Sequence, residues 1–426
     1  MTLIKNFDGL NKTLQRKICL ELIEEALKSI QPQNIIGKNL SLENDILTIQ
    51  DRKINLTEFK RVFLLGFGKG SAGLSKKIEK ILGDFLTKGF VIDLVAEKLS
   101  KIELSTGTHP LPSNENFIFT KKVVEQLNKL TERDLVLIVV AGGGSAMFVY
   151  PYKITVEKLI EVNRSLLVSG ADIKEINIVR KHLSLVKGGG LAKLLYPASI
   201  VSIIASDVPG NDLSVIASAP TVKDPTTKND ALEILKKYNL LDKLNLSEND
   251  FLETPKEDMY FTNATNILLL SNQTALDAMK KKAKELGYSA VIFSDKFQAE
   301  AKFAGKELID QTLPNQILLA GGETTVKVLG KNGQGGRNQE VVLGTLENLD
   351  NYTLIASFDT DGWDNSKFAG AIGDIKTLEK AKELNLNPKN FLEENNSLSF
   401  FEKVGDGILT GRLPSNVSDL MIVLRI

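Results

Sequence analysis

Short apolar runs rich in β-branched residues alternate with helical patterns along almost the whole chain, and this alternation constrains the fold more than any other feature. The runs at 61–67 and 135–140 are almost entirely apolar, as expected for strands that are buried on both faces. Amphipathic patterns, such as those at 155–169 and 171–182, lie between the runs. This order predicts an α/β fold in which parallel sheets are covered by helices.

Two domains are expected, because 426 residues exceed what one hydrophobic core usually supports. The segment 238–262 is rich in charge, Asn and Pro and shows no strong strand pattern. The alternation then restarts, with expected strands that include 324–329 and 353–357. We therefore predict domains of residues 1–245 and 246–426, each a mostly parallel sheet covered by helices, with the active site in the interdomain cleft.

Charge and cysteine content exclude several classes of protein. Basic and acidic side chains both number 53, so no overall field attracts a nucleic acid or an anionic membrane. One cysteine and two histidines exclude an internal disulfide and a Cys/His zinc site, which suits a reducing compartment. The run at 135–140 is far shorter than the ~20 residues of a spanning helix. We expect a cytoplasmic protein that binds anionic ligands through local clusters.

A G-x-G-x-x-G motif at 68–73 follows one expected strand and opens a helix, and Asp93 ends the next strand. This arrangement is typical of a dinucleotide site, where the glycines admit the pyrophosphate and the acid binds a ribose hydroxyl. Lys69, however, places a cation inside a turn that normally uses bare backbone. We therefore favour a loop that handles phosphate or substrate, and keep a nicotinamide site and structural glycines as alternatives.

Three glycines and a serine follow the expected strand at 135–140, namely Gly142, Gly143, Gly144 and Ser145. Open α/β sheets bind ligands at the carboxyl ends of strands, and glycine N–H groups there can surround an anion. A sharp turn is the alternative, but it needs only one glycine. The run indicates a close approach of the backbone to a ligand.

A basic cluster stands out in the otherwise neutral chain and consists of Arg180, Lys181 and Lys187, followed by Gly188, Gly189 and Gly190. A solvated helix end would explain the charges, but the glycines directly after them favour an anion pocket. His182 is expected to be a satisfied core or surface histidine and not a catalyst.

Candidate metal ligands are the carboxylates that follow expected strands, namely Asp207, Glu323 and Asp361. Carboxylates at such positions suit Mg²⁺ near phosphates, although Asp is also an ordinary turn former. In the second domain Gly335, Gly336 and Arg337 open an expected helix. Backbone donors, a helix dipole and a guanidinium together suit a phosphoryl group in transfer.

Nine spaced motifs within 66–374 occur in the same order in glycerate 2-kinases: GKGSA, THPLP, GGGSA, VRKHLS, KGGGLA, SDVPGNDLS with ASAPT, GGETTV, GGRNQE and DTDG. The sequence resembles this family, which joins a glycerate kinase N-terminal domain to a C-terminal MOFRL domain. The resemblance implies ATP-dependent phosphorylation of D-glycerate to 2-phosphoglycerate. The family's proposed catalytic lysine and arginine fall on Lys69 and Arg337. Ala141 and Asn211 depart from the family's usual residues without removing an assigned role.

Each candidate residue then receives an expected role. We expect glycerate to contact Lys69, Ser145, Arg180 and Lys181. We expect the nucleotide and its phosphates to contact Gly142, Gly143, Gly144, Ser145, Lys187, Gly188, Gly189, Gly335 and Gly336. We expect Mg²⁺ on Asp207 and Asp361, with Glu323 as the third candidate.

Two other functions stay open at this point. An NAD(P)-dependent hydroxypyruvate reductase would use the GKGSAG loop as a dinucleotide fingerprint, and some members of the family carry that label. A non-catalytic binder of a phosphorylated metabolite would use the same anion-binding loops. The sequence also leaves the oligomeric state open, a homodimer included.

Overall fold

The computed structural model describes residues 2–330 and 332–426. The chain forms two compact units. The N-terminal unit comprises Ile35–Ser206 and Asn211–Leu269, and the C-terminal unit comprises Met1–Asn34, Asp207–Gly210 and Leu270–Ile426.

These units differ from the domains predicted from the sequence, which were 1–245 and 246–426. The first 34 residues group with the C-terminal unit, and 246–269 groups with the N-terminal unit. The first difference could not be predicted from the sequence pattern, because the helix at 14–29 joins a unit whose main part, Leu270–Ile426, begins more than 230 residues later in the chain.

A buried arginine anchors the N-terminal helices to the C-terminal unit. Helix α2 (Leu14–Ser29) packs against α11 (Asn272–Glu285). The fully buried Arg16 of α2 donates from Nε to Asp374 at 2.7 Å and from Nη1 to Asp406 at 2.8 Å. Helix α1 (Phe7–Leu10) precedes α2.

The N-terminal unit contains a six-stranded sheet in the order β6-β5-β4-β7-β8-β9. Its paired strands from β6 to β8 are parallel, as predicted. The strands are β4 (Arg61–Phe67), β5 (Leu86–Asp93), β6 (Ile102–Thr106), β7 (Asp134–Val140), β8 (Ser199–Ala205) and β9 (Ala264–Leu270).

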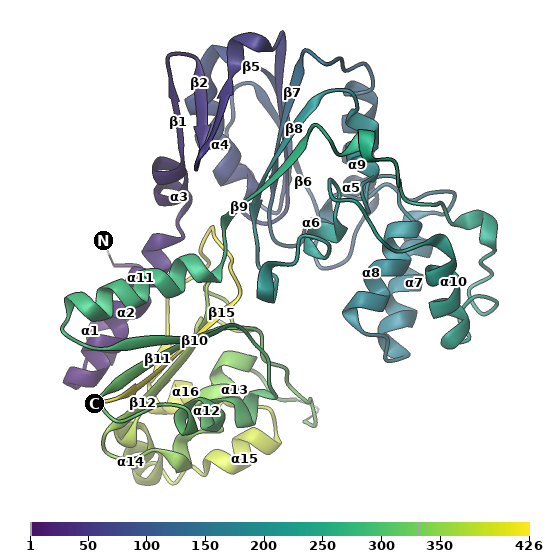
Figure 1. Ribbon diagram of the computed structural model, residues 1–426. Coiled ribbons are helices and arrows are strands. Elements are labelled where there is room, and N and C mark those ends of the chain that lie inside the picture. Colours follow the sequence, from purple (N-terminus) through teal and green to yellow (C-terminus); the bar gives the residue numbers. More distant parts are fainter. Residues whose placement is uncertain (1, 331) are drawn as a thin grey trace. The chain divides into compact units, whose positions relative to one another are not determined.

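Helices cover this sheet and also form a cluster of their own. Helices α7, α8 and α10 share an apolar core beside the sheet, and they lie together in Figure 1. The helices of this unit are α3 (Pro32–Asn39), α4 (Ser71–Leu82), α5 (Asn114–Gln126), α6 (Gly144–Met147), α7 (Val156–Val168), α8 (Ile173–His182), α9 (Gly190–Leu195) and α10 (Lys228–Lys237). A small antiparallel sheet, which the sequence did not predict, comprises β1 (Leu40–Glu43), β2 (Ile46–Ile49) and β3 (Arg52–Asn55).

The C-terminal unit contains a mixed sheet in the order β10-β11-β15-β12-β13-β14. The pair β10–β11 is parallel and the other pairs are antiparallel, so the prediction of a mostly parallel second sheet is wrong. An apolar run that is buried on both faces reveals a strand but not its direction. The strands are β10 (Ala290–Phe297), β11 (Gln316–Gly322), β12 (Thr353–Asp359), β13 (Gly370–Gly373), β14 (Gly407–Ile408) and β15 (Asp419–Arg425).

Figure 1 shows α2 and α11 on one face of this sheet and α12, α13 and α16 on the other. The expected strand at 324–329 is absent, and Thr325 makes only an isolated bridge to Glu300. The remaining helices are α12 (Ala301–Asp310), α13 (Arg337–Leu343), α14 (Ile375–Glu383), α15 (Pro388–Glu393) and α16 (Ser397–Val404). Within residues 2–330 and 332–426, no helix has the length and apolar character needed to cross a membrane.

Candidate active site

Two glycine loops meet at the carboxyl edge of the N-terminal sheet, because β4 and β7 are parallel neighbours. The backbone N–H of Lys69, just after β4, donates to the carbonyl of Gly142, just after β7, at 2.7 Å. Gly68 has a φ of +108°, and a Cβ there would lie 2.3 Å from the carbonyl oxygen of Ala141. The two glycine motifs found in the sequence are therefore in direct contact.

Asp93 has a structural role that the dinucleotide interpretation did not anticipate. Its carboxylate is 1% exposed and accepts the N–H groups of Ala72 at 2.9 Å and of Gly70 at 3.3 Å. Burial raises the pKa of Asp93, whereas these backbone hydrogen bonds oppose that rise. The side chain caps the first turn of α4, so it is not directed at a ribose.

A cavity of about 390 Å³ opens beside the second glycine loop, with a volume typical of small-molecule sites. Its polar wall includes His109, Gly143, Ser145, Asn163, Arg180 and Lys187. Arg180 donates from Nε to Asn163 Oδ1 at 2.7 Å, which fixes the guanidinium at the wall. The structure thus brings together four of the predicted binding residues, Gly143, Ser145, Arg180 and Lys187.

Lys187 is a buried cation in this wall. Its Nζ donates to the carbonyls of Ser145 at 2.7 Å and Phe148 at 3.4 Å. Burial lowers the pKa of Lys187 to about 7, and repulsion from Arg180 makes a smaller contribution to this lowering. An anion in the cavity would favour the charged form of both side chains, so this wall is suited to a carboxylate or phosphate.

A segment with a strained backbone, residues 217–219, contacts the same cavity wall. Ala217, Ser218 and Ala219 have φ values of +49°, +61° and +57° although none is a glycine. Ser218 Oγ donates to Asn177 Oδ1 at 3.1 Å and lies 3.0 Å from Ser145 Oγ. Since the single hydroxyl proton of Ser218 is directed at Asn177, Ser145 is the donor to Ser218. Such strained residues cost about 1–3 kcal/mol each and concentrate at functional sites.

Gly188 and Gly189 bind this strained segment. Their N–H groups donate to the carbonyls of Ser218 at 2.9 Å and Ala219 at 2.7 Å. Both glycines have positive φ, which the tight loop requires. This bonding gives the two glycines a structural role and does not favour the predicted contact with phosphate.

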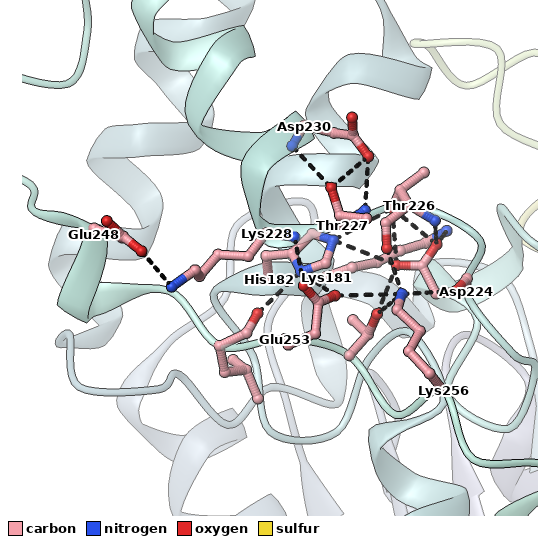
Figure 2. A network of polar contacts seen from close by, with 12 residues as sticks. Lys181, His182, Asp224, Thr226, Thr227, Lys228, Asp230, Glu248, Glu253 and Lys256 are labelled. Carbon is pink, nitrogen blue, oxygen red and sulfur yellow. Dashed lines mark hydrogen bonds and ion pairs between the residues drawn. The ribbon is translucent and has the colours of Figure 1, made fainter.

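Lys181 lies in a different environment from its neighbour Arg180 (Figure 2). Its Nζ donates to Asp224 Oδ1 at 3.2 Å, and both side chains are buried. His182 is fully buried, with Nδ1 3.0 Å from the carbonyl of Leu252 and Nε2 3.3 Å from Thr226 Oγ1. Of the two non-catalytic alternatives, core or surface, the structure places His182 in the core. Lys181 is not one of the residues that line the cavity.

The C-terminal unit gathers carboxylates at one edge of its sheet. Because β15 runs antiparallel between β11 and β12, its first residue, Asp419, pairs with both Gly322 and Asp359. Glu323 follows directly after β11. No role was predicted from the sequence for Asp419 or Asp359, although Asp359 ends one apolar run and Asp419 begins another.

Arg337 lies among these acids. Its Nε donates to Asp419 at 2.5 Å, its Nη1 bonds to Glu323, and its Nη2 lies 3.7 Å from Asp359. Burial raises the pKa of Asp419 to about 6 although Arg337 opposes that rise. Burial also raises the pKa of Asp359, and repulsion from Asp419 and Asp361 adds to this rise. The guanidinium therefore neutralises buried acids in this structure.

The side chain of Asp364 caps the N-terminus of the helix that starts at Arg337. Asp364 accepts the N–H groups of Asn338 at 3.0 Å and Gln339 at 2.9 Å. A Cβ at Gly336 would lie 2.1 Å from Asp364 Oδ1. The predicted open helix N-terminus is thus occupied, although Gly335, Gly336 and Arg337 still line a cavity of about 440 Å³.

The candidate metal ligands do not form a complete site. Asp207 follows β8, and Asp361 follows β12, where its N–H donates to Asp359 Oδ1 at 2.9 Å. Glu323 is bonded to Arg337. Among the described residues, no group of three or more His, Cys, Asp or Glu side chains is arranged to hold a metal ion.

Fold and site together define an α/β protein with a cavity lined by cationic side chains at strand ends of one unit and an arginine among carboxylates in the other. Two family models match the chain: "Domain of unknown function (DUF4147)" over residues 18–253 and "MOFRL family" over residues 316–419.

Relatives along the whole chain agree with these matches. A glycerate 2-kinase of Pyrococcus horikoshii is 36% identical over 96% of this chain and 97% of its own length. A solved glycerate kinase structure from Thermotoga maritima has a TM-score of 0.83 and 33% identity and covers 96% of this chain and 99% of that one. An Agrobacterium vitis protein with the provisional name hydroxypyruvate reductase is 34% identical over 85% of this chain and 87% of its own length. The chain belongs to the glycerate 2-kinase family with DUF4147 N-terminal and MOFRL C-terminal domains.

Proposed function

We propose that the protein transfers the terminal phosphoryl group of ATP to the 2-hydroxyl of D-glycerate and releases 2-phosphoglycerate. The observation that carries this proposal is the cavity beside the Gly142–Ser145 loop. It combines the side chains of Arg180 and Lys187 with a volume that suits a small hydroxy acid. Family membership supports a kinase.

The residues of this wall suggest how glycerate binds. The planar guanidinium of Arg180 can bind a carboxylate through two parallel hydrogen bonds. Lys187, whose Nζ donates to the carbonyl of Ser145, adds a second positive charge to the wall. Lys69 lies in the adjoining loop, where its ammonium would bind the phosphoryl group. Positioning and charge stabilisation of this kind supply most of the acceleration in phosphoryl transfer.

Arg337 and the acids of the C-terminal unit are proposed to act on the nucleotide. Mg²⁺ usually keeps several waters and takes one or two carboxylates together with phosphate oxygens, so a complete protein cage is not needed. Asp361 and Asp207 would supply those carboxylates, and the ion would neutralise charge on the phosphates. Asp359 and Asp419 add further negative charge at the edge where Asp361 lies, and this charge would favour a cation there.

The experiment is a coupled assay of ADP formation from ATP, with D-glycerate and Mg²⁺ each omitted in turn. We expect ADP formation only when both are present. NAD(P)H with hydroxypyruvate, followed by absorbance, tests the reductase alternative, and we expect no oxidation because Asp93 is buried under α4. NAD(P)H oxidation without glycerate-dependent ADP formation would contradict the proposal.

A further inference from the structure

The cavity wall contains an imidazole as well as cationic side chains. His109 lies in the THPLP segment, between β6 and α5, and is one of the lining residues. Its imidazole packs against the second glycine loop, since a Cβ at Gly143 would lie 2.6 Å from Cδ2 and 2.9 Å from Nε2 of His109. The Nε2 edge of the ring therefore lies over the loop that also carries Ser145.

A buried asparagine holds this segment in place. Asn116 of α5 accepts the N–H of Thr108 at 2.9 Å through Oδ1 and donates to the carbonyl of Thr108 at 2.9 Å through Nδ2. The same Nδ2 donates to the carbonyl of Ala146 at 2.9 Å. Asn116 thus ties the residue before His109 to the end of the glycine loop, so the backbone next to His109 is held beside the cavity.

The imidazole of His109 is a possible proton acceptor at the cavity. Burial and the positive charge of Lys69 lower the pKa of His109 to about 4, so its ring is neutral near neutral pH. The charged groups on this wall are cations, namely Arg164 of α7, Arg180 of α8 and Lys187 before α9. No carboxylate lines the cavity in the described chain. The second histidine, His182, is fully buried, with both ring nitrogens near hydrogen-bond partners.

We infer that His109 is the general base that accepts the hydroxyl proton of glycerate during phosphoryl transfer. The inference rests on the proposed function. In this step the O–H bond of glycerate breaks, a bond forms between its oxygen and the γ-phosphorus, and the bond from that phosphorus to the leaving ADP oxygen breaks. The proton moves to a ring nitrogen of His109, and the imidazolium then releases it to water.

Lys187 is the competing proton acceptor, because its pKa is also lowered into the neutral range. Its Nζ, however, donates to the carbonyls of Ser145 and Phe148, which suits the charged form that binds a carboxylate. The imidazole of His109 makes its close contact with the loop through the Cδ2–Nε2 edge. The two groups are therefore assigned different roles, and the experiment separates them.

The test compares wild type, His109→Gln, His109→Ala and Lys187→Met in the ADP assay across the pH range in which each stays folded. A general base contributes about 10²–10⁴ in rate, so we expect kcat of both His109 variants to fall by that factor. The KM for D-glycerate should change by less than about fivefold in them. Added imidazole should restore part of the kcat of His109→Ala but not of His109→Gln, which fills the vacated space.

The pH profile provides the second readout. Wild-type kcat should fall at acidic pH as the ring is protonated, and this limb should be absent in His109→Gln and present in Lys187→Met. A kcat of His109→Gln within about threefold of wild type would overturn the inference. So would an acidic limb that persists in His109→Gln and disappears in Lys187→Met. Wild type without glycerate-dependent ADP formation would instead overturn the proposed function, and the inference with it.

Discussion

Lys69 is held at the site by its backbone, because its N–H donates to the carbonyl of Gly142 across the two glycine loops. A substitution of its side chain therefore leaves this hydrogen bond intact. We predict that Lys69→Ala lowers kcat by about 10²–10⁴, the range for single electrostatic groups in such reactions, with a smaller rise in KM. Lys77→Ala, which removes an exposed lysine from the adjoining helix, is the matched control and should retain wild-type kinetics.

Both variants should melt within a few degrees of wild type. A Lys69→Ala enzyme with a kcat within about threefold of wild type would exclude the lysine from the mechanism. A loss of activity that merely follows a loss of folded protein would exclude it as well.

Arg337 differs from Lys69, because its guanidinium pairs with the fully buried Asp419. Removing the cation leaves an uncompensated acid, so Arg337→Ala should lose on the order of 2–4 kcal/mol of stability as well as kcat. The double variant Arg337→Met with Asp419→Asn should recover much of the stability, because it removes both charges. Denaturant unfolding and kcat, measured on the same samples, check this prediction. If the double variant also recovers kcat, Arg337 only stabilises the fold.

At the scale of elements, α8 presents its neighbouring cations to different surroundings. Consecutive residues on a helix point about 100° apart, so Arg180 faces the cavity while Lys181 pairs with Asp224 in the network of Figure 2. Asp224 also accepts hydrogen bonds from Thr226 and Thr254. The pair therefore supports the segments behind the site.

This placement predicts that Asp224→Asn loses on the order of 3 kcal/mol of stability, since it leaves Lys181 buried without its carboxylate. Lys181→Met with Asp224→Asn should regain most of that loss and keep the KM for D-glycerate within about threefold of wild type. Thermal unfolding and steady-state kinetics are the measurements. A tenfold rise of KM in a double variant of normal stability would show that Lys181 binds substrate, as the sequence suggested.

Elements that bury one long apolar run were predicted best. The run at 61–67 is β4, and β7 differs from its predicted run at 135–140 by one residue. The direction of β15 and the four-residue strands β1 to β3 were not predicted, and the strand predicted at 324–329 is absent. Strand direction depends on distant pairing, and a four-residue strand offers too few positions for a period of two to show.

The candidate site was predicted only in part, for a related reason. Glycine motifs at strand ends located the cavity wall and its residues Ser145, Arg180 and Lys187. Sequence could not show that Asp93 turns inward to cap α4 or that Asp419 joins Arg337 from a strand 82 residues later. Both contacts depend on how the side chains and strands pair in three dimensions.

At the scale of the whole molecule, the N-terminal helices pack with the last part of the chain. Arg16 binds Asp374, Asp406 and Thr377, so the N-terminal helices are part of the C-terminal unit. We predict that Arg16→Met costs on the order of 3–5 kcal/mol of stability, because it leaves buried acids unpaired. Lys17→Met, on the exposed side of the same helix, is the control and should unfold like wild type. Equal denaturant midpoints for the two variants would contradict this anchor.

The most direct test of the account is the identity of its product. Purified protein is incubated with ATP, Mg²⁺ and D-glycerate, and the reaction is followed by phosphorus NMR. The account predicts one new phosphomonoester signal that coincides with added 2-phosphoglycerate, together with an equal amount of ADP. A signal that coincides with 3-phosphoglycerate would contradict the proposed position of transfer, and the absence of any glycerate phosphoester would contradict the kinase itself.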